Sequence, residues 1–293
     1  MTKEMIKTRY DLDLEIYTMK VDKPQAVIVL CHGASEHIER YQDFARFLNE
    51  NNISVYGYNH PGHGPNRPQD SVYFADKDGD KLLIDTLEDV ILYTYQHNAD
   101  IPIYLLGHSM GSLITRAFCI NTKLVIDGVI ICGSLNPSNK SISSGSALAS
   151  TLAKLTGKKR ANKLVNKIAF GKLEDTLSYN MDNVKNYIED KHCGMLFSNQ
   201  AIVDLLKITK KVVNPINVKK MIDTDYFIIS GKADPFSDGT NQLYDLMHNM
   251  NKGKLNYEYK FYDNMKHEIL NETDNHIVYS DVLDFINIGT TKK

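Results

Sequence analysis

Short apolar runs rich in β-branched residues recur along the chain, and most of them end at or near a glycine. The runs cover residues 26–30, 53–58, 103–106, 129–132, 226–229 and 255–262. Continuous apolar runs of this length predict strands that are covered on both faces, as in a parallel sheet. The last run alternates more than the others, which indicates a strand near the sheet edge.

The segments between these runs repeat their apolar residues at the spacing of a helix. Three such faces consist of Tyr41, Phe44, Phe47 and Leu48, of Leu83, Leu87, Val90 and Ile91, and of Leu243, Leu246, Met247 and Met250. Because predicted strands and helices alternate, we expect a doubly wound, mostly parallel α/β sheet. An antiparallel ribbon that extends to about Lys20 is expected to precede it.

Residues 138–218 interrupt this alternation, because they are polar, helical in pattern and without a convincing strand. Small residues at 141–150 predict a loop or hinge. Residues 151–172 carry many basic side chains and no acidic one, with an apolar helix face between them. We therefore expect an α/β core in two parts, residues 1–137 and 219–293, with residues 138–218 inserted as a helical lid.

Composition narrows the class of protein. The 293 residues are 42% hydrophobic and 24% charged, as in a globular protein with a large core. A net charge of −2 argues against a nucleic-acid partner. We find no secretory segment and no run that could span a membrane, so a cytoplasmic location is expected. The four cysteines show no metal-binding spacing, and we expect no metal, cofactor or obligate protein partner.

The motif G-H-S-M-G at residues 107–111 carries the most specific chemical information. It lies between an expected strand and an expected helix, which is the context of a nucleophile elbow. The tight turn would expose the Ser109 hydroxyl at the carboxyl end of the sheet. It would also leave the Met110 N–H free at the helix N-terminus, where it can stabilise an oxyanion. We therefore expect the α/β-hydrolase fold, with Ser109 as nucleophile.

A serine hydroxyl needs an adjacent base, and in this fold the chain order is serine, acid, histidine. Asp234 follows the fifth core run and His267 follows the last one. We expect Asp234 to orient the imidazole of His267, which then acts as general base. Asp238 and Asp263 are the alternative acids, and His276 is the alternative base.

The loop at residues 32–37 follows the first core strand and is the expected source of a second oxyanion donor. Ala34 is the candidate, through its backbone N–H. Gly33 before it has no side chain and lets the backbone approach the nucleophile closely.

Five motifs together resemble those of one family. They are H-G-A-S-E-H at 32–37 followed by Arg40-Tyr41, H-P-G-H-G at 60–64, G-H-S-M-G at 107–111, S-G-K-A-D-P at 230–235 and H-E-I-L-N-E at 267–272. The chain resembles the monoacylglycerol lipase and lysophospholipase branch of the α/β-hydrolases, related to the serine aminopeptidase S33 group. The resemblance implies a lid, an oxyanion hole of Ala34 and Met110, and hydrolysis of a single-chain lipid ester. Asn59 and Pro65-Asn66 depart from the usual pattern, which bears on substrate preference.

The expected substrate contacts fall into two groups. Gly33, Glu36 and His108 adjoin the nucleophile, and Leu155, Leu164 and Ile168 would line an acyl tunnel under the lid. The lid residues could equally pack the lid on the core. The basic helix of the lid could lie on an anionic lipid surface, or it could be a solvated lysine-rich face.

Two other function classes stay open. An amide or peptide hydrolase would need an acidic pocket for a substrate amine, with Glu36, Glu189 and Asp190 as candidates. A non-catalytic ligand-binding relative would have no need of a serine, an acid and a histidine together.

Overall fold

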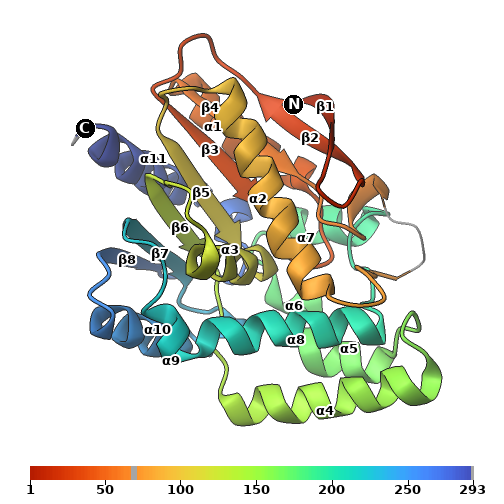
Figure 1. Cartoon of the computed structure of the whole chain (residues 1–293). Helices are drawn as coiled ribbons and strands as arrows, with labels where there is room; N and C mark the ends of the chain where they lie inside the picture. Colours follow the sequence, from red (N-terminus) through yellow and green to blue (C-terminus); the bar gives the residue numbers. More distant parts are fainter. Residues whose placement is uncertain (67–70, 292–293) are drawn as a thin grey trace.

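A computed structural model describes residues 1–66 and 71–291 of the chain (Figure 1). Eight strands form one sheet in the order β1-β2-β4-β3-β5-β6-β7-β8. The strands are β1 (Thr2–Lys7), β2 (Asp13–Met19), β3 (Ala26–Cys31), β4 (Ile53–Tyr58), β5 (Ile103–His108), β6 (Gly128–Cys132), β7 (Asp225–Gly231) and β8 (Tyr257–Tyr262). Strands β3 to β8 are parallel, whereas β1 and β2 form the antiparallel ribbon. The expected mostly parallel sheet is confirmed, with β8 at its edge.

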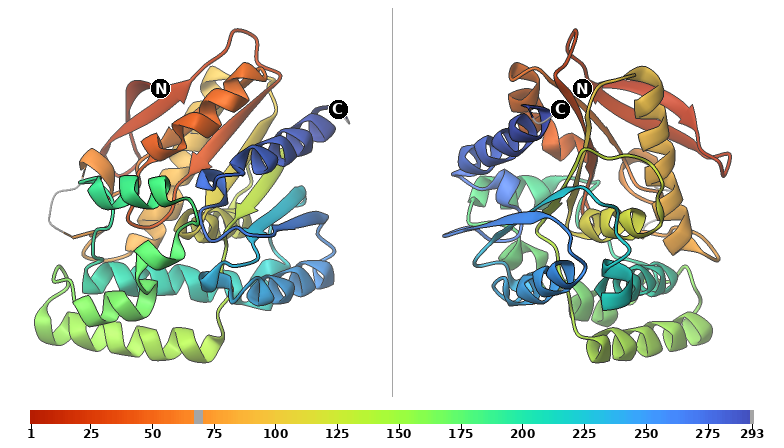
Figure 2. Two further views of the ribbon diagram at one scale, coloured as in Figure 1. Left: turned by 180° about the vertical axis from the view of Figure 1, so that it is seen from behind. Right: turned by 60° about the vertical axis from the view of Figure 1, so that its left-hand side comes forward.

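Helices cover both faces of the sheet. The core helices and 3₁₀ turns are α1 (Gln42–Glu50), α2 (Gly79–His97), α3 (Met110–Asn121), α10 (Asn241–Lys252), α11 (Asn275–Thr291), η1 (Ile38–Tyr41), η2 (Gly64–Asn66), η3 (Pro235–Ser237) and η4 (Ile269–Asn271). Alternate residues of β3 point to opposite faces. Val27 and Val29 belong to one buried cluster with residues of α2, α3 and α10, and Ile28 and Leu30 belong to another with residues of α1 and α11. The left view of Figure 2 shows α1 and α11 on the face seen from behind.

An insertion of helices lies between β6 and β7, and we use "the insertion" for residues 138–218. It contains α4 (Asn139–Thr156), α5 (Lys163–Phe170), α6 (Leu173–Thr176), α7 (Met181–Glu189), α8 (Asn199–Val213) and α9 (Pro215–Val218). Helices α4, α5 and α8 gather at the bottom of Figure 1, below the sheet, whereas α7 lies higher, beside it. The expected core ranges also include 67–70 and 292–293, which lie outside the described residues.

The small residues at 141–150 are helical, so the expectation of a loop or hinge there is wrong. They form most of α4, and the Ser138 hydroxyl caps that helix by accepting from the Ser141 N–H. Small side chains let α4 approach α8 closely, since a methyl group at Gly145 would already be 3.4 Å from Leu206. A tertiary contact therefore overrides the weak helix propensity of serine and glycine.

The basic stretch at 151–172 is not a single helix. Gly157 ends α4 with φ at 103°, a backbone conformation that favours glycine, and α5 begins six residues later. The basic side chains are therefore divided between two helices, the turn that joins them and the residues after α5. Among the described residues, no helix has the length and apolar character that crossing a membrane requires.

Candidate active site

The turn between β5 and α3 presents Ser109 at the carboxyl end of the sheet. Ser109 has φ 52° and ψ −118°, a strained conformation held by the strand before it and the helix after it. A side chain at Gly111 would collide with the carbonyl oxygen of Cys31 on the neighbouring strand. Only glycine therefore lets α3 begin directly against β3, as the elbow motif predicts.

Ser109, His267 and Asp234 come together although 125 and 33 residues separate them along the chain. His267 Nε2 is 2.8 Å from Ser109 Oγ, and His267 Nδ1 is 2.9 Å from Asp234 Oδ2. The alternatives lie elsewhere. Asp263 pairs with Lys232, and His276 lies within α11.

The loop after β7 holds the Asp234 carboxylate in place. Asp234 is fully buried, its Oδ1 accepts from the Phe236 N–H at 2.9 Å, and its Oδ2 accepts from Ser230 Oγ at 3.3 Å. The Phe236 ring lies 4.5 Å from the imidazole of His267. These contacts fix both partners before any substrate binds, which favours general-base chemistry.

Two backbone N–H groups beside Ser109 have no hydrogen-bond partner within the part of the chain that the structure describes. They belong to Ala34 and Met110, and both residues line the same cavity as Ser109. The neighbouring Gly33 approaches the nucleophile so closely that a methyl group there would be 3.2 Å from Ser109 Cβ. The arrangement can accept a developing negative charge from two sides.

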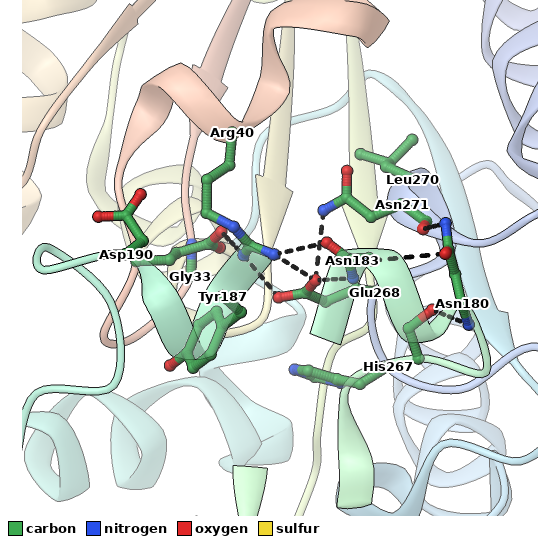
Figure 3. A network of polar contacts seen from close by, with 12 residues as sticks. Gly33, Arg40, Asn180, Asn183, Tyr187, Asp190, His267, Glu268, Leu270 and Asn271 are labelled. Atoms are coloured by element: carbon green, nitrogen blue, oxygen red, sulfur yellow. Dashed lines mark hydrogen bonds and ion pairs between the residues drawn. The ribbon is translucent and has the colours of Figure 1, made fainter. Parts of the chain in front are cut away.

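A buried ionic network supports the loop at 32–37 from behind (Figure 3). Arg40 donates to Glu36 Oε2 at 2.6 Å and forms a bidentate pair with Glu268, both bonds being 2.6 Å. Asn183 from α7 joins the network, because its Oδ1 accepts from Arg40 and its Nδ2 donates to Glu268 Oε2. Gly33 N–H donates to Glu36 Oε1 at 2.6 Å, so the network holds the oxyanion loop directly.

His108 links this network to the elbow and to the loop that carries the base. Its Nδ1 is 3.2 Å from Glu36 Oε1, and its Nε2 is 3.2 Å from the carbonyl oxygen of His267. Tyr41 Oη also lies 3.0 Å from Nδ1, and it donates its own proton to Glu36 Oε1. The neighbours of both ring nitrogens can therefore accept, and the geometry favours a proton on each nitrogen. Burial opposes that charge, yet the hydrogen bond to Glu36 raises the pKa of His108 above its usual value. Burial would raise the pKa of Glu36, but His108 and Arg40 hold it well below its usual value.

A cavity of about 390 Å³ opens at Ser109 between the sheet and the insertion. Nearly half of its lining residues come from α4, α5 and α8, and the wall is mainly apolar. Its lining includes Ile142 and Leu148 from α4, Val165, Ile168 and Phe170 from α5, and Ile202, Leu205 and Leu206 from α8. This volume lies in the range of sites that enclose small ligands.

Four of the six residues expected to contact the substrate line the cavity, and two do not. Gly33, Glu36, His108 and Ile168 border the cavity, although the polar groups of Glu36 and His108 are engaged in the ionic network. Leu155 and Leu164 are not among its lining residues, and they are 77% and 66% exposed. The prediction that these two line an acyl tunnel is wrong, because each side chain points from its helix to solvent.

Among the described residues, one group of side chains could hold a metal ion, and it adjoins the oxyanion loop. The group consists of His37, Asp190 and Cys193. None of the three contributes to the contacts of Ser109 with His267 and Asp234.

A search of known families gives a match across most of the chain. The model of the family described as serine aminopeptidase, S33 matches residues 22–274. The chain belongs to the serine aminopeptidase S33 family.

Relatives of this S33 member include named lipases. A monoglyceride lipase homolog of Monkeypox virus is 29% identical over 271 residues, which cover 88% of this chain and 87% of the viral protein. The monoglyceride lipase of Rattus norvegicus is 24% identical over 271 residues, or 87% of this chain and 80% of the rat protein.

Solved structures share the fold of this S33 member. A carboxyl esterase from Bacillus coagulans aligns with a TM-score of 0.88 and 18% identity, covering 99% of this chain and 98% of the esterase. A monoglyceride lipase from Saccharomyces cerevisiae in complex with a substrate analog aligns with a TM-score of 0.78 and 18% identity, covering 99% and 95%. The α/β-hydrolase fold expected from the elbow is therefore confirmed.

The sequence did not reveal the roles of Arg40, Asn183 and Glu268. Arg40 and Glu268 stand in the quoted motifs, but nothing in the spacing showed that they pair across 228 residues. Asn183 lies in the insertion, where the motifs find no match. A charged residue in a motif is too frequent on protein surfaces to indicate a buried pair, and Asn183 carries no charge at all.

Proposed function

We propose that this S33 member hydrolyses the carboxylic ester of a single-chain lipid, such as a monoacylglycerol or lysophospholipid, through an acyl-enzyme. Its family and its relatives named monoglyceride lipase make it a hydrolase of lipid esters. The observation that carries the finer proposal is the alignment of Ser109, His267 and Asp234 at one end of an apolar cavity.

In the proposed mechanism, Ser109 Oγ attacks the ester carbonyl while His267 Nε2 takes its proton. The N–H groups of Ala34 and Met110 stabilise the oxyanion. Asp234 accepts from His267 Nδ1 and stabilises the imidazolium. The imidazolium then gives its proton to the leaving alcohol, and a water activated by His267 releases the fatty acid from Ser109.

The form of the cavity supports one acyl chain as the substrate. Its wall from α4, α5 and α8 is mainly apolar, so binding an alkyl chain there would remove apolar surface of that chain from water. We propose that the insertion acts as a lid over this chain. The polar groups at the Ser109 end would hold the ester itself.

An amide or peptide hydrolase is the less favoured candidate. A substrate amine would need a carboxylate facing the cavity, but Glu36 and Glu268 are both paired with Arg40. Within the described residues, Glu189 and Asp190 do not line the cavity. A non-catalytic binding protein is disfavoured by the short contacts of the three aligned side chains.

Hydrolysis of p-nitrophenyl esters from acetate to palmitate, measured beside an aminoacyl anilide, tests the proposal. We expect turnover of the esters with a preference for longer chains, and no turnover of the anilide. Ser109→Ala should lower kcat by several powers of ten. Faster cleavage of the anilide would favour the peptidase, and unchanged ester turnover by Ser109→Ala would remove the nucleophile assignment.

Peripheral contact with a membrane is a separate proposal, based on the outer face of α4 and α5. Leu155 and Leu164 are exposed there, and Lys154 and Lys163 precede them directly in the sequence. Apolar side chains surrounded by lysines suit the surface of an anionic bilayer. Such contact would place the mouth of the cavity next to its substrate.

A further inference from the structure

The insertion is bound to the oxyanion loop by a set of short hydrogen bonds around Ser35. The Ser35 carbonyl oxygen accepts from Gly194 N–H at 2.9 Å and from Tyr187 Oη at 3.0 Å. Ser35 Oγ donates to the carbonyl oxygen of Met195 at 2.6 Å. The segment that follows α7 is therefore held in register with the loop that follows β3.

Three side chains with metal-binding chemistry meet across this junction. His37 comes from the oxyanion loop, and Asp190 and Cys193 come from the segment after α7. One potential ligand atom from each lies within 4.8 Å of the other two. His37 Nε2 and Asp190 Oδ2 are 2.8 Å apart, and the side chain of His37 is only 8% exposed.

We propose that His37, Asp190 and Cys193 bind a zinc ion that joins the insertion to the oxyanion loop. The set of one imidazole, one carboxylate and one thiolate suits Zn²⁺, which accepts nitrogen, oxygen and sulfur ligands in tetrahedral geometry. Bond lengths of about 2.0–2.3 Å place tetrahedral ligand atoms about 3.3–3.8 Å apart. The three ligand atoms lie within 4.8 Å of one another, and those of His37 and Asp190 are 2.8 Å apart. Small shifts of the side chains would therefore bring all three to the distances that zinc requires.

The surroundings of the three ligands also suit a metal. Glu39 Oε2 lies 3.8 Å from His37 Nδ1, which is too far for a hydrogen bond, and Nδ1 is buried without a hydrogen-bond partner among the described residues. A small shift of Glu39 would provide the carboxylate acceptor that commonly supports a zinc-bound histidine. Cys193 is a free thiol and is buried. On binding, its proton leaves to solvent as the Zn–S bond forms. Asp190 is 31% exposed, which gives the ion a route from solvent and leaves the fourth position to water.

A zinc ion at this site would cross-link His37 and Asp190, which are 153 residues apart in the sequence. The same loop carries Ala34, three residues before His37. A bound ion would therefore stabilise both the docked part of the insertion and the oxyanion loop. The site is separate from Ser109 and His267, so it does not depend on the proposed reaction.

The test is metal binding by the full chain after dialysis against chelator. We expect one equivalent of Zn²⁺ by calorimetry and a rise in Tm on addition of Zn²⁺, because an ion that binds only the folded state stabilises it. Co²⁺ in place of Zn²⁺ should give a thiolate-to-cobalt charge-transfer band. Cys193→Ala should abolish that band, and both Cys193→Ala and His37→Gln should weaken Zn²⁺ binding at least about tenfold.

Three controls separate this site from other metal binding. Cys119→Ala, a buried thiol in α3, and His97→Gln, an exposed imidazole in α2, should bind Zn²⁺ like the unaltered chain. His267→Ala should also bind normally, which separates the site from the catalytic imidazole. Circular dichroism confirms that each variant is folded. Unchanged affinity in Cys193→Ala and His37→Gln, or no binding at micromolar free Zn²⁺, would overturn the proposal.

Discussion

Histidine in this chain takes different roles because each imidazole meets a different surrounding. His32, His60 and His63 pack against one another beneath the oxyanion loop, with ring centroids 4.2–5.9 Å apart. Burial lowers the pKa of His60 to about 4 and that of His63 to about 3. His108 is equally buried, but its pKa is raised because a carboxylate faces it. Neighbouring charge, and not burial alone, decides which imidazole carries a proton.

Stability should fall as the pH drops from 6.5 towards 4. In the unfolded chain the histidines take up protons near pH 6.5, whereas His60 and His63 stay neutral in the folded state until about pH 4 and 3. Each pKa unit corresponds to about 1.4 kcal/mol, so His60 alone should remove roughly 3 kcal/mol over this window. Urea unfolding at a series of pH values measures the slope. A free energy of unfolding that is constant between pH 6.5 and 4.5 would contradict this account.

Glu36→Gln should reduce both activity and stability. The change removes the charge that faces Arg40 and His108 and weakens the acceptor that holds Gly33 N–H. Loss of one partner from a buried ion pair costs about 3 kcal/mol or more, and a misplaced oxyanion loop can cost about 100-fold in rate. Ester turnover and urea unfolding measure the two effects. Glu50→Gln, at an exposed position of α1, is the matched control and should change neither.

At the scale of the elements, two glycines let helices approach their neighbours to different degrees. Gly111 lets α3 touch β3, and a methyl group there collides with a carbonyl oxygen. Gly145 lets α4 lie on α8, but a methyl group there would meet only side-chain carbon at 3.4 Å. The first contact involves backbone that cannot move, and the second involves a leucine that can.

Gly111→Ala and Gly145→Ala should therefore differ strongly in their effect on stability. The collision at Gly111 should cost about 3 kcal/mol or more and displace the elbow, with loss of ester turnover. Alanine at 145 should change the free energy of unfolding by less than about 1 kcal/mol, because it gains helix propensity against a mild contact. Urea unfolding of the pair measures the difference. Equal destabilisation would show that the close approach at Gly111 has no special role.

The outer face of α4 and α5 should determine binding to lipid vesicles. The double change Leu155→Ser and Leu164→Ser should weaken sedimentation with anionic vesicles while leaving turnover of a short, dissolved ester intact, since neither side chain lines the cavity. Added salt should weaken binding by the unaltered chain, because it screens the lysines. Val125→Ser, 71% exposed and outside the insertion, is the matched control. Binding that the double change does not alter would exclude this face.

At the scale of the whole molecule, the insertion and the sheet share one hydrophobic core. Ile142 and Ala149 of α4 and Ile202 of α8 belong to the same buried cluster as Val27 and Val29 of β3. Polar contacts around Ser35 and Glu268 join the insertion to the catalytic loops as well.

The shared core predicts that the chain unfolds in one cooperative step. A calorimetric scan should give a single transition whose calorimetric and van't Hoff enthalpies agree. Loss of ester turnover should follow the same curve. A separate early transition that removes helical signal and leaves the sheet intact would show that the insertion folds as an independent unit.

The sequence by itself determined the features that depend on neighbouring residues. Apolar runs predicted the core strands, because β3 to β7 are buried on both faces, and the G-x-S-x-G turn predicted the elbow, because its backbone needs those glycines. The chain order of the fold further pointed to Asp234 and His267.

Only the tertiary structure decided what depends on packing between distant segments. It set Asp234 and not Asp263 against His267, turned Leu155 and Leu164 away from the cavity, and brought charges of the oxyanion loop, α7 and the last loop into one buried network. It also gathered His37, Asp190 and Cys193, whose spacing in sequence resembles no metal motif. The spacing of apolar residues along the chain indicates which face of a helix or strand is buried, but not which residues of another element that face contacts.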